Sequence, residues 1–260
     1  MITVISFDRS RSRREIVAQL QLLLHQTDCG VRSGIFTFGV PAIDNYLPHG
    51  GLSLGALHDI VPDTPEDLPA AFGFIIALLC RLMGTGPVLI VTSPKGLVSG
   101  RIHGHGLTML GLDPRRAILI ETEDEIQVHW VIEEALKSHV PAAIAAMAGA
   151  EPDIKAGRRL HLAAEKAGLP LLFLRPGGGG KSSAGMTRWR IGGAQAARDR
   201  FGILTAWRWR VKLERCRNGR PGEWLVEFDH DTHRFSLAHA MADHALPQSA
   251  ITQSLSRRSG

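Results

Sequence analysis

A short strand, a loop and a very apolar helix within residues 56–82 constrain this chain more than any other segment. Residues 56–61 read as a buried strand, residues 62–65 as a loop, and residues 70–82 as a helix with almost no polar side chain. A helix that is hydrophobic on all sides must be covered on all sides. The segment therefore predicts a layered fold in which this helix packs on a sheet.

The loop between this strand and this helix has none of the residues that bind phosphate. In P-loop NTPases, a loop at this place carries the motif G-x-x-x-x-G-K-[ST]. Here residues 61–68 read V-P-D-T-P-E-D-L, without glycine or lysine. Asp63, Glu66 and Asp67 repel a triphosphate, and the two prolines have no N–H to donate. We therefore predict a degenerate P-loop and no bound nucleotide cofactor.

Two further requirements of ATP hydrolysis are missing. The strand that would end in a magnesium-binding aspartate ends A-A-M-A at residues 145–148, and Asp153 comes too late in the chain. The preceding core strand runs from Thr92 into Ser93 rather than into a carboxylate. The sequence thus predicts no catalytic residues, and we expect that the protein is not an enzyme.

A second segment imitates a phosphate-binding loop. Residues 177–183 read G-G-G-G-K-S-S, but Arg175 stands where the motif needs its first glycine, and no apolar helix follows. We interpret the segment as a flexible loop. An unorthodox ATPase that uses Lys181 and Ser182 is the alternative, and in that case Lys181→Ala would abolish hydrolysis.

The rest of the chain alternates between strands and helices, which is typical of a mostly parallel sheet flanked by helices on both faces. The expected strands are 87–92, 117–121, 140–147 and 170–175, and the expected helices are 99–110, 123–138 and 156–168. Strands then follow one another at 186–191, 204–215, 223–228 and 234–237, with an Asn-Gly hairpin turn at residues 218–219. These C-terminal strands are expected to extend the sheet in antiparallel fashion.

We divide the chain into three parts: an N-terminal helix and linker (1–34), a core domain (35–240) and a disordered tail (241–260). Residues 1–9 are expected to be a loose lead-in. The helix expected over 10–26 carries an apolar stripe, which docks on its own domain or binds a partner. The stripe consists of Ile16, Leu20, Leu23 and Leu24.

Basic residues alternate with apolar ones in two of the C-terminal strands. Residues 207–213 read W-R-W-R-V-K-L, and a basic residue lies on each side of Trp189. Because strand side chains alternate between the faces, the cations share one face. That face is either a solvated outer surface or a site for the phosphate backbone of single-stranded DNA. The candidate DNA- or partner-binding residues are Lys181, Arg188, Arg190, Arg208, Arg210 and Lys212.

Composition limits the class of protein. The net charge of +5 and the pI of about 9.5 fit a polyanionic partner. Cys29, Cys80 and Cys216 stand far apart, so we expect no disulfide and a cytoplasmic location. Residues 70–80 are too few to span a membrane, which takes roughly 20 residues. The histidines at 103 and 105 and the group at 229–233 lack a further ligand set, so we predict no metal.

Several stretches, taken in order, resemble the ImuA family over about residues 35–238. They are F-G-V-P-A-I-D-N-Y-L-P-H-G-G-L-S-L-G-A-L-H-D-I, G-L-D-P-R-R-A-I-L-I-E, V-I-E-E-A-L-K-S, R-R-L-H-L-A-A-E-K-A-G-L-P-L-L-F-L-R-P, T-R-W-R-I and W-R-V-K-L-E-R-C-R-N-G-R-P-G-E-W-L-V-E-F-D-H. The resemblance implies a RecA-like core whose nucleotide site has been lost.

The resemblance also implies a role. It points to an accessory protein of SOS-induced, error-prone translesion synthesis that binds ImuB, an inactive relative of lesion-bypass polymerases, and through it an error-prone replicative-type polymerase. RecA and single-stranded DNA are further candidate partners, with recruitment from the cytoplasm to the nucleoid. An SOS cell-division inhibitor that binds the tubulin-like ring protein is the remaining alternative.

Overall fold

A large sheet forms the centre of the computed structural model, which describes residues 2–6, 34–84, 86–96, 100–149, 153–175 and 184–238. Within these ranges the sheet has ten strands in the order β1-β6-β5-β7-β8-β4-β9-β10-β11-β12, and β2 pairs with β3 separately. The strands are β1 (Thr3–Ser6), β2 (Ile35–Phe36), β3 (Leu52–Ser53), β4 (Leu57–Pro62), β5 (Val88–Thr92), β6 (Ala117–Glu121), β7 (Ala143–Met147), β8 (Leu171–Leu174), β9 (Thr187–Arg198), β10 (Leu204–Cys216), β11 (Gly222–Asp229) and β12 (Phe235–Leu237). The α-helices are α2 (Pro41–Asp44), α3 (Leu68–Leu82), α4 (Gly104–Met109), α5 (Glu125–Ser138) and α6 (Ile154–Ala167), and the 3₁₀ turns are η1 (Pro48–Gly50), η2 (Pro65–Asp67) and η3 (Pro114–Arg116).

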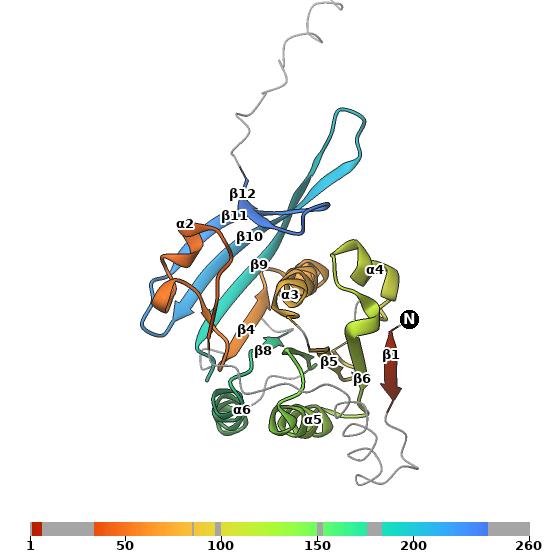
Figure 1. The fold of residues 1–260 in the computed structure, drawn as a ribbon, viewed down its shortest axis with the longest axis vertical. Helices are drawn as coiled ribbons and strands as arrows, with labels where there is room; N and C mark the ends of the chain where they lie inside the picture. The colour runs from red at the N-terminus through yellow and green to blue at the C-terminus, as the bar shows by residue number, and fades with distance from the viewer. Residues whose placement is uncertain are drawn as a thin grey trace, which may run out of the picture.

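The sheet changes from parallel to antiparallel at β9. Along the ten-stranded sheet, each pair of neighbouring strands in the order β1-β6-β5-β7-β8-β4-β9 runs parallel. Strands β9 to β12 are joined as antiparallel neighbours. The predicted α/β class, with a mostly parallel sheet and C-terminal antiparallel strands, is therefore confirmed (Figure 1).

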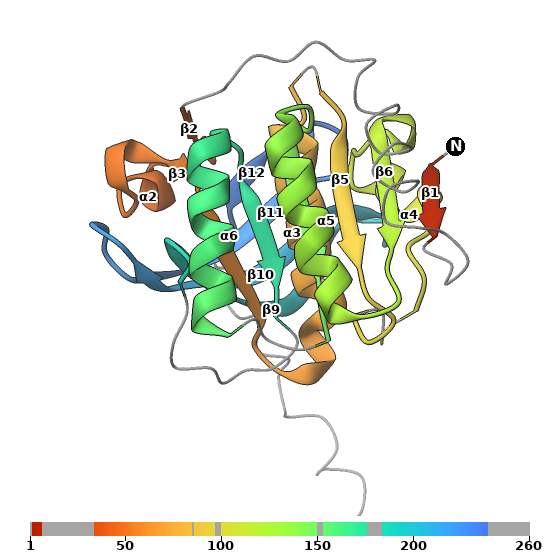
Figure 2. The same cartoon turned by 90° about the horizontal axis from the view of Figure 1, so that it is seen from below.

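Helices cover both faces of the parallel part. Helix α3 lies on one face, and α5 and α6 lie side by side on the other (Figures 1 and 2). Strands β5 and β8 are buried at every position and are apolar apart from Thr92, as expected of strands covered from both sides. No helix in the described ranges is long and apolar enough to cross a membrane.

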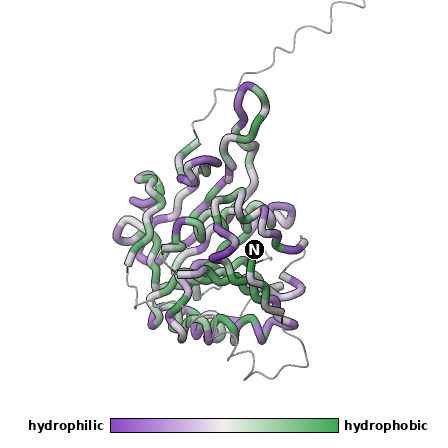
Figure 3. Tube along the Cα trace, turned by 45° about the vertical axis from the view of Figure 1, so that its right-hand side comes forward, coloured by the Kyte–Doolittle hydropathy of each residue, from purple (hydrophilic) through white to green (hydrophobic). Residues whose placement is uncertain are grey.

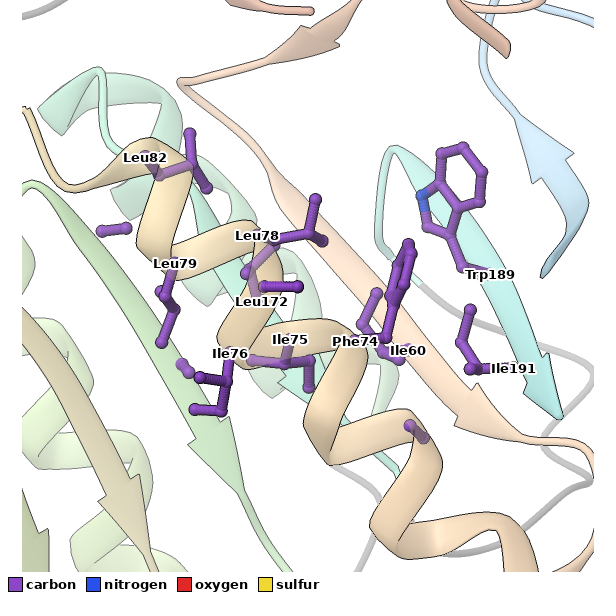
Figure 4. Packing of buried hydrophobic residues seen from close by; sticks show 14 of the residues in the cluster. Ile60, Phe74, Ile75, Ile76, Leu78, Leu79, Leu82, Leu172, Trp189 and Ile191 are labelled. Carbon is purple, nitrogen blue, oxygen red and sulfur yellow. The ribbon is translucent and has the colours of Figure 1, made fainter. Parts of the chain in front are cut away.

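Helix α3 is the main core helix, as predicted. Arg81 is its only charged residue, and most of its apolar side chains are fully buried. Phe74, Ile76 and Leu79 belong to the core cluster that also contains Ile60 of β4 (Figure 4). A separate apolar cluster fills the space between α5, α6 and the opposite face of the sheet.

Three expectations from the sequence are wrong. The lead-in contains strand β1, which pairs in parallel with β6 at the edge of the sheet. The helix expected over 99–110 is only α4, because residues 100–103 are not helical. The apolar residues of 123–138 also predict a buried Ile126, but its side chain is 71% exposed because it lies in the first turn of α5, away from the buried face of that helix.

Strand β9 is longer than the apolar pattern predicted, whereas β10 matches its predicted bounds to within one residue. Strand β9 continues to Arg198, and the hairpin that it forms with β10 extends beyond the body of the protein (Figure 1). Both hydrophilic and hydrophobic segments lie at the end of this arm (Figure 3). Phe201 and Ile203 there are 72% and 63% exposed.

The packing of α3 gives a first prediction. Replacement of Ile76, which is fully buried, by alanine should lower the free energy of unfolding by about 2–5 kcal/mol. The matched change Ile126→Ala, at an exposed position of α5, should alter the free energy of unfolding by no more than about 0.5 kcal/mol. Urea unfolding of both variants measures the difference. Equal effects of the two changes would contradict the burial of α3.

Candidate functional site

The loop between β4 and α3 lies against the strands beside it. The N–H of Asp63 donates a 2.8 Å hydrogen bond to the carbonyl oxygen of Ile191 in β9. The Asp63 carboxylate lies 3.6 Å from the guanidinium group of Arg210 in β10. The first residues after β4 are thus attached to the antiparallel part of the sheet.

Asp67 fixes the second half of this loop. Its Oδ1 accepts a 2.7 Å hydrogen bond from the N–H of Gly193, and its Oδ2 accepts bonds from the N–H and the hydroxyl of Thr64. Burial acts to raise the pKa of the Asp67 carboxyl, but these hydrogen bonds outweigh burial and hold the pKa below its ordinary value. The carboxylate is therefore an ionised acceptor inside the loop.

The start of α3 is occupied by acids rather than prepared for phosphate. Pro65 and Pro69 have no N–H, while Glu66 and Asp67 place negative charge at the positive end of the helix. An anion that approached this end of the helix would meet like charge. The geometry does not suit a phosphate group.

The carboxyl ends of β5 and β7 meet at a carboxylate that the sequence did not reveal. Glu125, from the first turn of α5, accepts hydrogen bonds on Oε1 from the Ser93 hydroxyl at 2.7 Å and from the N–H of Gly149 at 2.9 Å. Ser93 Oγ also accepts from the N–H of Gly96. No local pattern points to this contact, because Ser93 and Glu125 are 32 residues apart. These hydrogen bonds join three loops at the carboxyl-end edge of the sheet, where parallel sheets of this kind bind ligands.

A buried ion pair joins β4 to the end of β8. Arg175 Nε donates a 2.7 Å hydrogen bond to Oδ1 of Asp59, and both side chains are almost fully buried. Burial raises the pKa of the Asp59 carboxyl, against the opposing effect of the Arg175 guanidinium. No local sequence pattern predicts this pair, because Asp59 and Arg175 are 116 residues apart. Arg175, the residue that interrupts the glycine-rich motif, is thus engaged inside the core.

The cations predicted to form a basic face include two that share an acid. Arg188 Nε lies 3.4 Å from Oε2 of Glu214, and Arg190 Nε lies 2.5 Å from Oε1 of the same carboxylate. Arg188 is also buried, with 8% of its surface exposed. Its side chain is therefore poorly placed to meet a ligand from solution.

The other cations of this face also lie beside acids. Arg208 Nε donates a 2.6 Å hydrogen bond to Glu227, and Arg210 faces Asp63. Lys212 is exposed and lies opposite Glu223 in the register of β10 and β11. The sheet thus brings the five cations together as predicted, but in a mixed arrangement of cations and acids rather than as a positive stripe.

The remaining candidate residues lie outside the described ranges. They are Lys181 of the glycine-rich loop and Ile16, Leu20, Leu23 and Leu24 of the N-terminal stripe. Their proposed roles stay predictions.

The histidine and aspartate groups have local roles. His103 Nδ1 accepts a hydrogen bond from the N–H of His105 at the start of α4, and the Asp229 carboxylate accepts from the N–H groups of Asp231 and Thr232 in a turn. Three side chains arranged to hold a metal ion are not found anywhere in the described residues.

Comparison with known proteins identifies the family. No family model matches the chain. Two curated relatives from different strains of Caulobacter vibrioides, both named Protein ImuA, are each 39% identical to it over 231 residues, which covers 81% of this chain and 91% of the relative. The chain belongs to the ImuA family. The resemblance to this family that the sequence stretches indicated is therefore confirmed.

The hydrogen bonds of Asp67 in the loop after β4 give a second prediction. Asp67→Ala should lower the free energy of unfolding by about 1–3 kcal/mol, because it leaves Gly193 N–H without its acceptor and removes the cap of the turn. Glu66→Ala, a neighbouring exposed position, should cost no more than about 0.5 kcal/mol. Thermal or urea unfolding measures both. Equal stability of the two variants would show that Asp67 does not hold the loop.

Proposed function

We propose that this chain is a non-catalytic adaptor with a RecA-like core, which acts in SOS-induced, error-prone translesion DNA synthesis. Membership of the ImuA family supports the pathway. The loop after β4 supports the non-catalytic part of the proposal. Its own Asp67 carboxylate accepts the hydrogen bond from the Gly193 N–H and holds the loop against β9.

The strand order supports the RecA-like part. Strand β4 lies between the parallel strands β8 and β9, near the middle of the ten-stranded sheet, and the carboxyl ends of β5 and β7 lie at the same edge as its loop. A nucleotide-hydrolysing protein built in this way holds its phosphates and magnesium there. In this chain the loop is acidic, and the nearby Glu125 is engaged by Ser93 and Gly149. We interpret the loop as a degenerate P-loop.

The partner that we propose is ImuB, the inactive polymerase relative, through which the chain joins an error-prone replicative-type polymerase. RecA and single-stranded DNA are additional proposed contacts, and the proposed location is the cytoplasm, with recruitment to the nucleoid. Because Arg190 and Arg208 each lie against a glutamate, phosphates would have to compete with those acids for the basic face. This pairing favours a protein as the main partner and leaves direct DNA contact through the face a prediction.

Co-elution tests the adaptor role. The purified chain, mixed with ImuB, should elute with it from a size-exclusion column equally well with and without Mg-ATP, because no step of the assembly needs nucleotide. A catalytically active lesion-bypass polymerase in place of ImuB is the matched control and should not co-elute. Absence of a complex, or a complex that forms only with ATP, would refute the proposal.

A further inference from the structure

A large apolar pocket lies beside the loop after β4 and shares Gly193 and Arg208 with the contacts described above. Its volume is about 670 Å³, within the usual range of ligand sites. The walls come from α3, α4 and the base of the β9–β10 arm, and include Phe72, Ile76, Leu107, Trp207 and Trp209. Aromatic and aliphatic walls of this kind are typical of sites that take up large apolar side chains.

Small residues on three elements create the hollow. Gly73 of α3, Gly106 of α4, and Gly193, Ala194 and Ala196 of β9 all line it. A Cβ atom added at Gly106 would have no other atom within 4 Å. A larger side chain at this position of the pocket wall therefore fits without displacing the backbone.

The ionisable side chains that line the pocket are all basic. They are Arg101, His103 and Arg208, and no acid belongs to the lining formed by the described residues. Arg101 is 86% exposed and lies 3.8 Å from Glu121. The Arg208 side chain is paired with Glu227 on the face of β10 opposite Trp209, so Arg101 and His103 supply the positive charge on the pocket side. Acidic groups placed beside an apolar anchor would thus meet favourable charge at the rim.

Exposed apolar side chains lie on two of the elements that form the pocket. Met109, in the wall formed by α4, is 37% exposed. Phe201 and Ile203 are exposed in the turn between β9 and β10, at the end of the arm whose base lines the pocket. An occupant that follows this surface is longer than a small molecule, so a protein segment fits it better.

The charge of the chain's own undescribed segments argues against them as occupants. Residues 7–33 contain five arginines and three acids, and residues 239–260 contain two arginines and one aspartate. Both segments are net basic, like the rim. A segment from another protein with the opposite charge complements the site better.

We propose that this pocket is a docking site for a segment of a partner protein that inserts large apolar side chains and presents acidic residues on either side of them. The proposal rests on the adaptor function and adds the chemistry of the partner segment. The apolar side chains enter between Phe72 and Trp209, while the flanking carboxylates face Arg101 and the neighbouring His103.

Selection of displayed random peptides on the full-length chain tests the chemistry without a known partner. Enriched peptides should combine aromatic or long aliphatic residues with Asp and Glu. Their affinity should fall more than about tenfold on Gly106→Trp, which fills the pocket, and should be kept on Gly106→Ala. Arg101→Glu, a change at an exposed position, should also weaken binding and serves if Gly106→Trp does not fold.

Three results of this selection would overturn the proposal. They are failure to enrich any peptide, enrichment of peptides that lack acidic residues, and equal binding to the parent chain and to Gly106→Trp. Binding of small apolar molecules alone, in the absence of peptide binding, would also overturn it.

A second measurement separates this proposal from the adaptor function. The parent chain and Gly106→Trp are each mixed with ImuB, and thermal unfolding confirms that the variant is folded. If the parent chain fails to co-elute, the adaptor function is refuted and the peptide selection alone decides on the pocket. If both chains co-elute equally, the adaptor function stands and the docking site is refuted.

Discussion

The hydrogen bond from Gly193 N–H to the Asp67 carboxylate is the contact on which this account of the molecule depends. It joins the loop after the central strand β4 to the strand β9 where the sheet becomes antiparallel. The same carboxylate caps the turn that leads into α3, because Thr64 donates to its other oxygen. One ionised side chain thus anchors the start of the core helix and closes the loop.

The consequences reach the rest of the sheet. The helix that the loop introduces fills the core on one face, so the loop cannot open widely without disturbing that core. At the neighbouring strand ends, Glu125 binds Ser93 and Gly149, which joins further loops at this edge. The loops at this edge are thus joined to one another by the chain's own hydrogen bonds.

Much of the fold could be predicted from the sequence. Apolar runs such as 117–121 predict buried strands of a parallel sheet, and the very apolar helix 70–82 predicts a helix packed on that sheet, since such segments have few other stable arrangements. Strand β1 was missed because a short edge strand with an exposed Val4 carries no periodicity of its own. The length of the arm was missed because residues 192–198 are small and polar, and their pairing with β10 decides their conformation.

The site was harder to predict than the fold. The acidic loop and its lack of phosphate-binding glycines can be read directly from residues 61–68. Contacts between residues distant in the chain, such as Asp59 with Arg175, follow only from the packing of the strands. The basic stripe was read correctly as sharing one face, yet the acids that pair with it, Glu214 and Glu227, stand on strands whose register the sequence did not fix.

Isothermal titration of Mg-ATP into the purified chain measures the central claim most directly. Because the loop after β4 is closed by Asp67 and offers acids in place of N–H donors, we expect no saturable binding, and an authentic P-loop ATPase titrated in parallel provides the positive control. Saturable binding with a Kd in the micromolar range would contradict the account, since a phosphate site would then exist where the structure places carboxylates.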